Sequence, residues 1–253
     1  MARKLDRDAA AVRAFAVLEA IAEEDGTATL ADLAAGAGLP KPTVHRLLLQ
    51  LCAAGLVSRE PEGRRYAVGQ RLSQLALRAL ANSTRRGARH AILQRLVDEL
   101  GETCNLTMLD GAEVVYLDRV ETASPLRVNL QPGSRVPLHC TASGKLLLAL
   151  LPAARRARLV SQLGMAKHTA QTLGTRAELE KEMKRVRAEK LSVDNEEFIT
   201  GLVCVAVPVI GRDGRAIAAV AVQAPVARMP LARALGHAPA LRRAAGALAE
   251  AFS

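Results

Sequence analysis

The sequence predicts an α+β protein in two parts: a small helical domain that ends in a hairpin, and a larger domain of mixed helices and strands. Three patterns lead to this prediction. Three short segments with helix-spaced apolar residues come first, an arginine-bearing hairpin pattern follows, and two nearly continuous apolar strands dominate the second half. With 253 residues, 50% of them hydrophobic, the chain can bury one or two ordinary cores without disulfides or metals.

The first part begins with three helices, of which the last two are joined by a tight turn. Residues 8–24 have apolar side chains at helical spacing, and residues 30–35 form a second helix for which Thr29 is the expected N-cap. Pro40 or Pro42 can occupy the first turn of the third helix, where a missing N–H costs nothing. Such a series is a helix-turn-helix pattern.

A β-hairpin is expected next. Residues 56–59 and 64–68 have the pattern of its two strands, with a polar turn between them and arginines at the tip and on the second strand, so the hairpin is typical of a wing. A helical stretch over residues 70–81 then ends in the polar segment 82–87, where we expect the domain boundary. The chain is therefore divided into a winged helix-turn-helix domain (1–69), a linker helix and hinge (70–87) and a second domain (88–253).

The second domain mixes helix and strand patterns. Its last two strands are the strongest pair in the chain, and their mostly apolar runs indicate a sheet covered on at least one face. We expect helices over residues 88–100, 143–151, 176–190 and 239–252, and strands over residues 103–109, 113–121, 126–130, 202–210 and 216–223.

Composition limits the classes of partner. The net charge of +10 permits a polyanionic partner, but residues 1–89 hold 14 Lys+Arg against 9 Asp+Glu and the remainder 21 against 16, so the charge is not concentrated. Only 2% of residues are aromatic, which disfavours stacking on single-stranded nucleic acid and leaves duplex DNA open. No apolar run approaches the ~18 residues of a membrane helix, and charges occupy the place of a signal peptide. A cytoplasmic protein is expected.

The third helix has polar residues around its apolar stripe. A recognition helix needs this arrangement, because apolar residues dock it while polar residues near its N-terminus reach base edges and phosphates. In isolation the same pattern is typical of a solvated helix face, but the tight turn and the hairpin favour DNA binding. The candidate DNA-binding residues are Lys41, Thr43, His45, Arg46 and Gln50 on the helix, and Arg64 and Arg65 on the hairpin.

The segment 138–145 (LHCTASGK) resembles several catalytic motifs without matching them. It lacks the spacing of a phosphate loop and of a Ser/Lys pair. A dyad of His139 and Cys140 is disfavoured, because adjacent side chains in an extended stretch point in opposite directions. The remaining interpretation is a loop and a helix N-terminus, whose N–H groups at Ala142 and Ser143 would attract a small carboxylate.

Two further groups of residues have side chains that can bind a metal or a ligand. The acidic cluster at 194–197 forms either a solvated turn or the polar lining of a ligand pocket, and no histidine is in register with it for a metal site. The four cysteines contain no C-x-x-C pair, which favours buried reduced thiols. We therefore expect no metal and no cofactor. The cysteines are Cys52, Cys104, Cys140 and Cys204.

Six segments, in order along nearly the whole chain, carry a resemblance to a known family. They are residues 38–48 (GLPKPTVHRLL), 55–57 (GLV), 65–69 (RYAVG), 137–145 (PLHCTASGK), 194–197 (DNEE) and 201–209 (GLVCVAVPV). Together they resemble the isocitrate lyase regulator (IclR) family of bacterial transcription regulators.

The resemblance implies an N-terminal winged helix-turn-helix, a linker helix used in dimerisation and a C-terminal GAF-like α/β domain that binds a small organic acid. Where some members that bind small acids have two hydroxyl residues on the last strand, this chain has Ala221 and Gln223. The identity of the effector therefore cannot be inferred from those members. The implied effector-binding residues are Ala142 and Ser143 through their amides, Asp194, Cys204, Ala221 and Gln223.

From these observations we expect a regulator without catalysis that binds a (pseudo)palindromic duplex DNA operator as a homodimer or homotetramer and senses a small organic acid. Two alternatives from other classes remain open. The second domain could be an enzyme, although no nucleophile stands at a recognisable spacing from a base and an orienting group. It could also be a thiol-based redox sensor, which would need a lowered thiol pKa that a sequence does not reveal.

Overall fold

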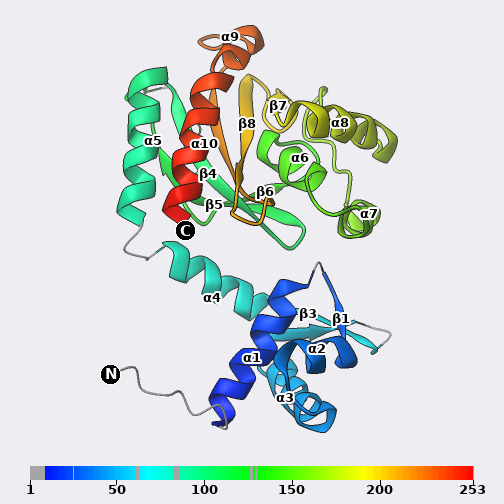
Figure 1. The fold of residues 1–253 in the computed structure, drawn as a ribbon. Coiled ribbons are helices and arrows are strands. Elements are labelled where there is room, and N and C mark those ends of the chain that lie inside the picture. Colours follow the sequence, from blue (N-terminus) through cyan, green and yellow to red (C-terminus); the bar gives the residue numbers. More distant parts are fainter. Residues whose placement is uncertain are drawn as a thin grey trace. The chain divides into compact units, whose positions relative to one another are not determined.

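The computed structural model describes residues 9–24, 26–60, 63–81, 86–125, 128 and 130–252. Contacts divide the chain into two compact units, Met1–Ala79 and Leu80–Ser253, which are described separately (Figure 1). In the described part of the chain, no helix is both long and apolar enough to cross a membrane.

The first unit contains three helices and a small sheet of order β1-β3-β2. Thr29 caps the second helix as predicted, because its side chain accepts from the N–H of Asp32 while the Asp32 carboxylate accepts from the N–H of Thr29. Gly38 ends that helix at a φ of 63° and tightens the turn that follows. The elements are α1 (Ala10–Glu23), β1 (Ala28–Thr29), α2 (Leu30–Ala37), α3 (Lys41–Ala53), β2 (Val57–Arg59) and β3 (Arg65–Val68).

A close backbone approach ties the end of the wing to the end of α3. The N–H of Gly69 donates to the carbonyl of Leu56 at 2.9 Å. A Cβ atom at position 69 would lie 2.4 Å from the carbonyl oxygen of Gly55, so only glycine fits here. The next helix, α4 (Gln70–Ala81), begins directly after this contact.

The second unit is built on a six-stranded antiparallel sheet of order β6-β5-β4-β9-β8-β7. One face packs against α5 and α10, and the other packs against α6, which in turn packs against α8 (Figure 1). The strands are β4 (Thr103–Asp110), β5 (Glu113–Val120), β6 (Arg135–Pro137), β7 (Ser192–Asn195), β8 (Leu202–Ile210) and β9 (Ala216–Pro225). The helices are α5 (Arg86–Leu100), α6 (Ala142–Ala149), α7 (Ala153–Gln162), α8 (Arg176–Glu189), α9 (Leu231–Gly236) and α10 (Ala238–Phe252).

The predicted fold class is confirmed, and most predicted elements end within two residues of their predicted bounds. Five elements are not among those predicted from the sequence: β1, β6, β7, α7 and α9. The missed strands have two to four residues, too few for a period of two to stand out. A strand was expected over residues 126–130, but residues 128 and 130 are not in a strand, and the other three positions lie outside the described residues. The strand that pairs with β5 on the side away from β4 is β6.

Candidate functional sites

Helix α3 exposes most of the polar residues expected to read DNA. Its opposite side is buried in the core of the first unit through Val44, Leu47, Leu48 and Leu51. Lys41, His45, Arg46 and Gln50 are exposed, and Thr43 is half-buried. Within the described residues the side chains of these five make no hydrogen bond or ion pair, so they remain available to a ligand.

The two arginines of the wing differ in their surroundings. Arg65 donates from Nε to the hydroxyl of Thr27 at 2.8 Å and from its guanidinium to the Thr27 carbonyl at 2.6 Å. It therefore anchors the chain before β1, and these donors are engaged inside the domain. Arg64 is exposed, and among the described residues it has no hydrogen bond or ion pair. Of the two, Arg64 is better placed to bind a phosphate.

A small cavity in the second unit lies between the N-terminus of α6 and the sheet. Its volume of about 20 Å³ has room for little more than one water molecule. Five of the six expected effector-binding residues line it: Ala142, Ser143, Asp194, Cys204 and Gln223. The sixth, Ala221, is fully buried in the core beneath α6 and is not part of the lining. The lining also includes residues that the sequence analysis missed: Thr107, Tyr116, Leu130, Val136, Thr141, Phe198 and Leu202.

The N-terminus of α6 presents free backbone donors to this cavity. Thr141 is extended (φ −119°, ψ 149°), and its hydroxyl accepts from the N–H of Gly144 at 3.1 Å. Among the described residues no group accepts from the N–H of Ala142 or Ser143. Unpaired N–H groups at a helix start carry partial positive charge, so they suit an anion.

Three polar or thiol side chains of the lining form a row across the sheet. Asp194 on β7 pairs with Cys204 on β8, and Cys204 pairs with Gln223 on β9. The side-chain amide of Gln223 lies within hydrogen-bond distance of the hydroxyl of Tyr116 (3.3 Å), the amide of Asn105 (3.2 Å) and the guanidinium of Arg119 (2.9 Å). Strand register therefore brings together residues that are far apart in the sequence.

Asp194 is buried with only 2% of its surface exposed, so it does not belong to a solvated turn. Its Oδ1 accepts from the N–H groups of Glu197 at 2.7 Å and Phe198 at 3.3 Å. Burial nevertheless raises the pKa of Asp194 to about 7, and the Glu197 carboxylate raises it while Lys145 opposes the rise. Near neutral pH this carboxyl group therefore exists in both protonation states.

A buried cation that the sequence analysis did not identify lies next to this carboxyl group. Lys145 on α6 is 1% exposed, makes an ion pair with Glu197 and lies 3.5 Å from Glu182 on α8. Burial raises the pKa of Glu197, and the neighbouring Lys145 ammonium opposes that rise. A lysine in a mostly apolar helix gives no sequence signal that its amino group is buried with acidic partners.

The buried thiols do not have the properties of reactive cysteines. Burial raises the pKa of Cys104 and Cys204, and it raises the pKa of Cys140 to about 12. The thiolate is the nucleophilic form of cysteine, so these surroundings disfavour a redox sensor.

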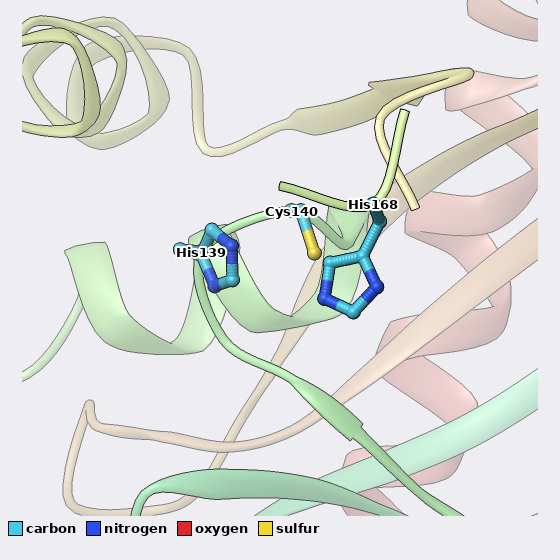
Figure 2. Close-up of side chains that lie close together, drawn as sticks. All are labelled: His139, Cys140 and His168. Carbon is cyan, nitrogen blue, oxygen red and sulfur yellow. The ribbon is translucent and has the colours of Figure 1, made fainter. Parts of the chain in front are cut away.

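The expectation that His139 and Cys140 diverge is wrong. Residues 138–141 form a bend instead of an extended stretch. Potential ligand atoms of His139, Cys140 and His168 lie within 4.8 Å of one another (Figure 2). His168 lies in the segment between α7 and α8, too far along the chain for a local motif to reveal the cluster.

Comparisons with known proteins agree with this architecture. The model of the IclR helix-turn-helix domain matches residues 10–61, and the model of the bacterial transcriptional regulator IclR C-terminal matches residues 78–250. The crystal structure of Thermotoga maritima IclR matches with a TM-score of 0.64 and 26% sequence identity, covering 94% of this chain and 96% of that chain.

Curated relatives also align with most of the chain. A probable transcriptional regulator SauR of Cupriavidus necator is 52% identical over 245 residues, which is 97% of each chain. The transcriptional repressor IclR of Escherichia coli is 31% identical over 219 residues, or 86% of this chain and 80% of that protein. The chain therefore belongs to the IclR family of bacterial transcriptional regulators, with a helix-turn-helix DNA-binding domain and a C-terminal IclR effector domain.

Proposed function

We propose that this regulator binds a (pseudo)palindromic duplex operator and that a small organic acid in the cavity of the second unit controls the binding. The observation that carries the effector proposal is the pair of free N–H groups at Ala142 and Ser143, which line a cavity beside the buried Asp194. As a bacterial transcription regulator without catalysis, the protein would act in the cytoplasm.

DNA recognition is proposed for α3 and the wing. His45, Arg46 and Gln50 are exposed on α3 and have side chains that pair with base edges or phosphates. Arg64 suits a phosphate, while Arg65 supports the wing through Thr27. A single recognition helix covers only a few base pairs, so we propose that a homodimer or homotetramer binds two half-sites.

The effector proposal follows from the polar groups of the cavity. A carboxylate would accept from the N–H groups of Ala142 and Ser143. The buried carboxyl group of Asp194 would accept from a hydroxyl or N–H of the ligand, and the charge of its deprotonated form would disfavour a dianion. Gln223 can both donate and accept where other members have hydroxyls. A monoanionic acid with one donor group therefore fits best, and the cavity must widen to admit more than a few atoms.

The enzyme and redox-sensor alternatives receive less support. Cys204 lines the cavity, but burial raises its pKa well above the usual value, and nearby Asp194 raises it further. A thiol in these surroundings is a poor nucleophile and is slow to oxidise.

Two experiments test the proposed function with the full chain. Selection of bound duplexes from a random library should give an inverted repeat. A thermal-shift screen of monocarboxylic and dicarboxylic acids should then find a monoanionic acid that raises the melting temperature. If the selected duplexes have no repeat and no acid stabilises the protein, the proposal is wrong in both parts.

A further inference from the structure

A thiol and two imidazoles meet in the second unit outside the lining of the cavity. Potential ligand atoms of His139, Cys140 and His168 all lie within 4.8 Å of one another. The two imidazole rings have centroids 5.9 Å apart and are tilted by 38°. In the view of Figure 2 the sulfur atom of Cys140 lies between the two rings.

A hydrogen bond to the backbone sets the tautomer of His139. His139 is 2% exposed, and its Nε2 lies 2.9 Å from the carbonyl oxygen of Ala166. A carbonyl only accepts, so the proton of the neutral ring is on Nε2 and the lone pair of Nδ1 is free. Metal-bound histidines usually donate their other N–H to a carbonyl or carboxylate in this way.

His168 can complete the site by a small movement. Zn–N distances of about 2.0–2.1 Å and a Zn–S distance of about 2.3 Å place tetrahedral ligand atoms roughly 3.4–3.6 Å apart. The cluster would therefore contract by roughly 1 Å from its widest separation. His168 is exposed, and the edge of its ring contacts Phe198 at a centroid distance of 5.1 Å, so its side chain has room to turn toward the sulfur.

We propose that His139, Cys140 and His168 bind a zinc ion and leave its fourth position open to water. Thiolate and imidazole ligands suit zinc, whereas magnesium and calcium prefer oxygen ligands. On binding, the zinc ion replaces the thiol proton of Cys140, and this proton is released to the solvent.

Cobalt(II) titration of the chelator-treated full chain tests the site directly. We expect one cobalt ion per chain, with the visible absorption of a tetrahedral centre and a thiolate-to-cobalt charge-transfer band. Zinc added afterwards should remove both, and zinc alone should raise the melting temperature. Cys140→Ser should abolish the charge-transfer band, and His168→Ala should weaken zinc binding about tenfold or more.

Two matched variants serve as controls. Cys52→Ser changes a cysteine of the first unit, and His90→Ala changes an exposed histidine of the second unit, so both should keep the wild-type spectrum. Because His168 is exposed, His168→Ala should keep the wild-type circular dichroism, and a loss of metal binding in that variant reports on the site. If wild-type protein gives no charge-transfer band, or if Cys140→Ser keeps it, the three residues do not bind a metal ion.

Discussion

Lys145 makes a buried ion pair with Glu197 that joins α6 to the turn after β7. The N–H of Glu197 in this same turn donates to Asp194, so the ion pair and the position of the Asp194 carboxyl group are connected. The side chains of Lys145 and Glu197 are 1% and 9% exposed, so water cannot replace either member of the ion pair.

Replacement of the cation, Lys145→Met, should therefore destabilise the second unit. Removal of one member of a buried ion pair leaves an uncompensated charge and typically costs about 3–5 kcal/mol. Urea unfolding followed by circular dichroism measures the change in the free energy of unfolding. The double variant with Glu197→Gln should recover part of the loss, and a single variant as stable as wild type would show that the ammonium is not needed.

The raised pKa of Asp194 predicts a pH-dependent stability. Its native pKa of about 7 exceeds the usual aspartate pKa of 3.8, so between these two values the native state binds the proton more tightly than the unfolded state does. The contribution of Asp194 to stability is therefore greatest at low pH and decreases as the pH rises through 7. Asp194→Asn should remove this pH dependence from the urea concentration at the unfolding midpoint. A constant difference between variant and wild type at all pH values would contradict the raised pKa.

Gly69→Ala should disrupt the junction between the wing and α4. The added Cβ would lie 2.4 Å from the carbonyl oxygen of Gly55 and cannot be accommodated without a backbone shift, at a cost of about 1–3 kcal/mol. Gly246→Ala is a matched control, because no atom lies within 4 Å of its added Cβ and alanine favours a helix. Thermal unfolding should show a loss for the first variant only. Equal melting temperatures would contradict the close approach.

The proposed DNA interface predicts different effects for three arginines. If Arg46 contacts a base, Arg46→Ala should reduce the preference for the operator over other duplexes by about 1–3 kcal/mol. Arg64→Ala should instead weaken binding to all duplexes and lower the slope of log affinity against log salt concentration by about one. Arg65→Ala should also lower thermal stability, because its bonds to Thr27 are lost. Anisotropy titrations at several salt concentrations separate these effects. Unchanged affinity in both Arg46→Ala and Arg64→Ala would contradict the interface.

Local signals explain how far the fold could be predicted. The Thr29 cap, the helical stripe of α3 and the apolar runs of β8 and β9 each specify their element within a short window. The three-residue strand β6 has no such window, because it exists only through its pairing with β5. Short edge strands are set by tertiary contacts, so the sequence does not reveal them.

The candidate site could be predicted only in part for the same reason. Ala142 and Ser143 directly follow Thr141, the N-cap residue of α6, so their free N–H groups are a local property of the helix start. Tyr116 and Thr107 join the lining through the register of β4, β5 and β9, and a shift of one residue would turn them away. The buried position of Lys145 depends on Glu182 and Glu197, which come from other elements.

Coupling between the cavity and DNA binding is tested most directly by titrating a selected operator duplex with the full chain, with and without the acid found in the screen. For wild type we expect the acid to change the Kd about 5- to 150-fold, the usual range of coupling free energies. Ala142→Pro removes one free N–H, and the extended Thr141 is compatible with a following proline. This variant and Asp194→Ala should bind the duplex like wild type and lose the response to the acid. An equal response in wild type and both variants would place the effector elsewhere.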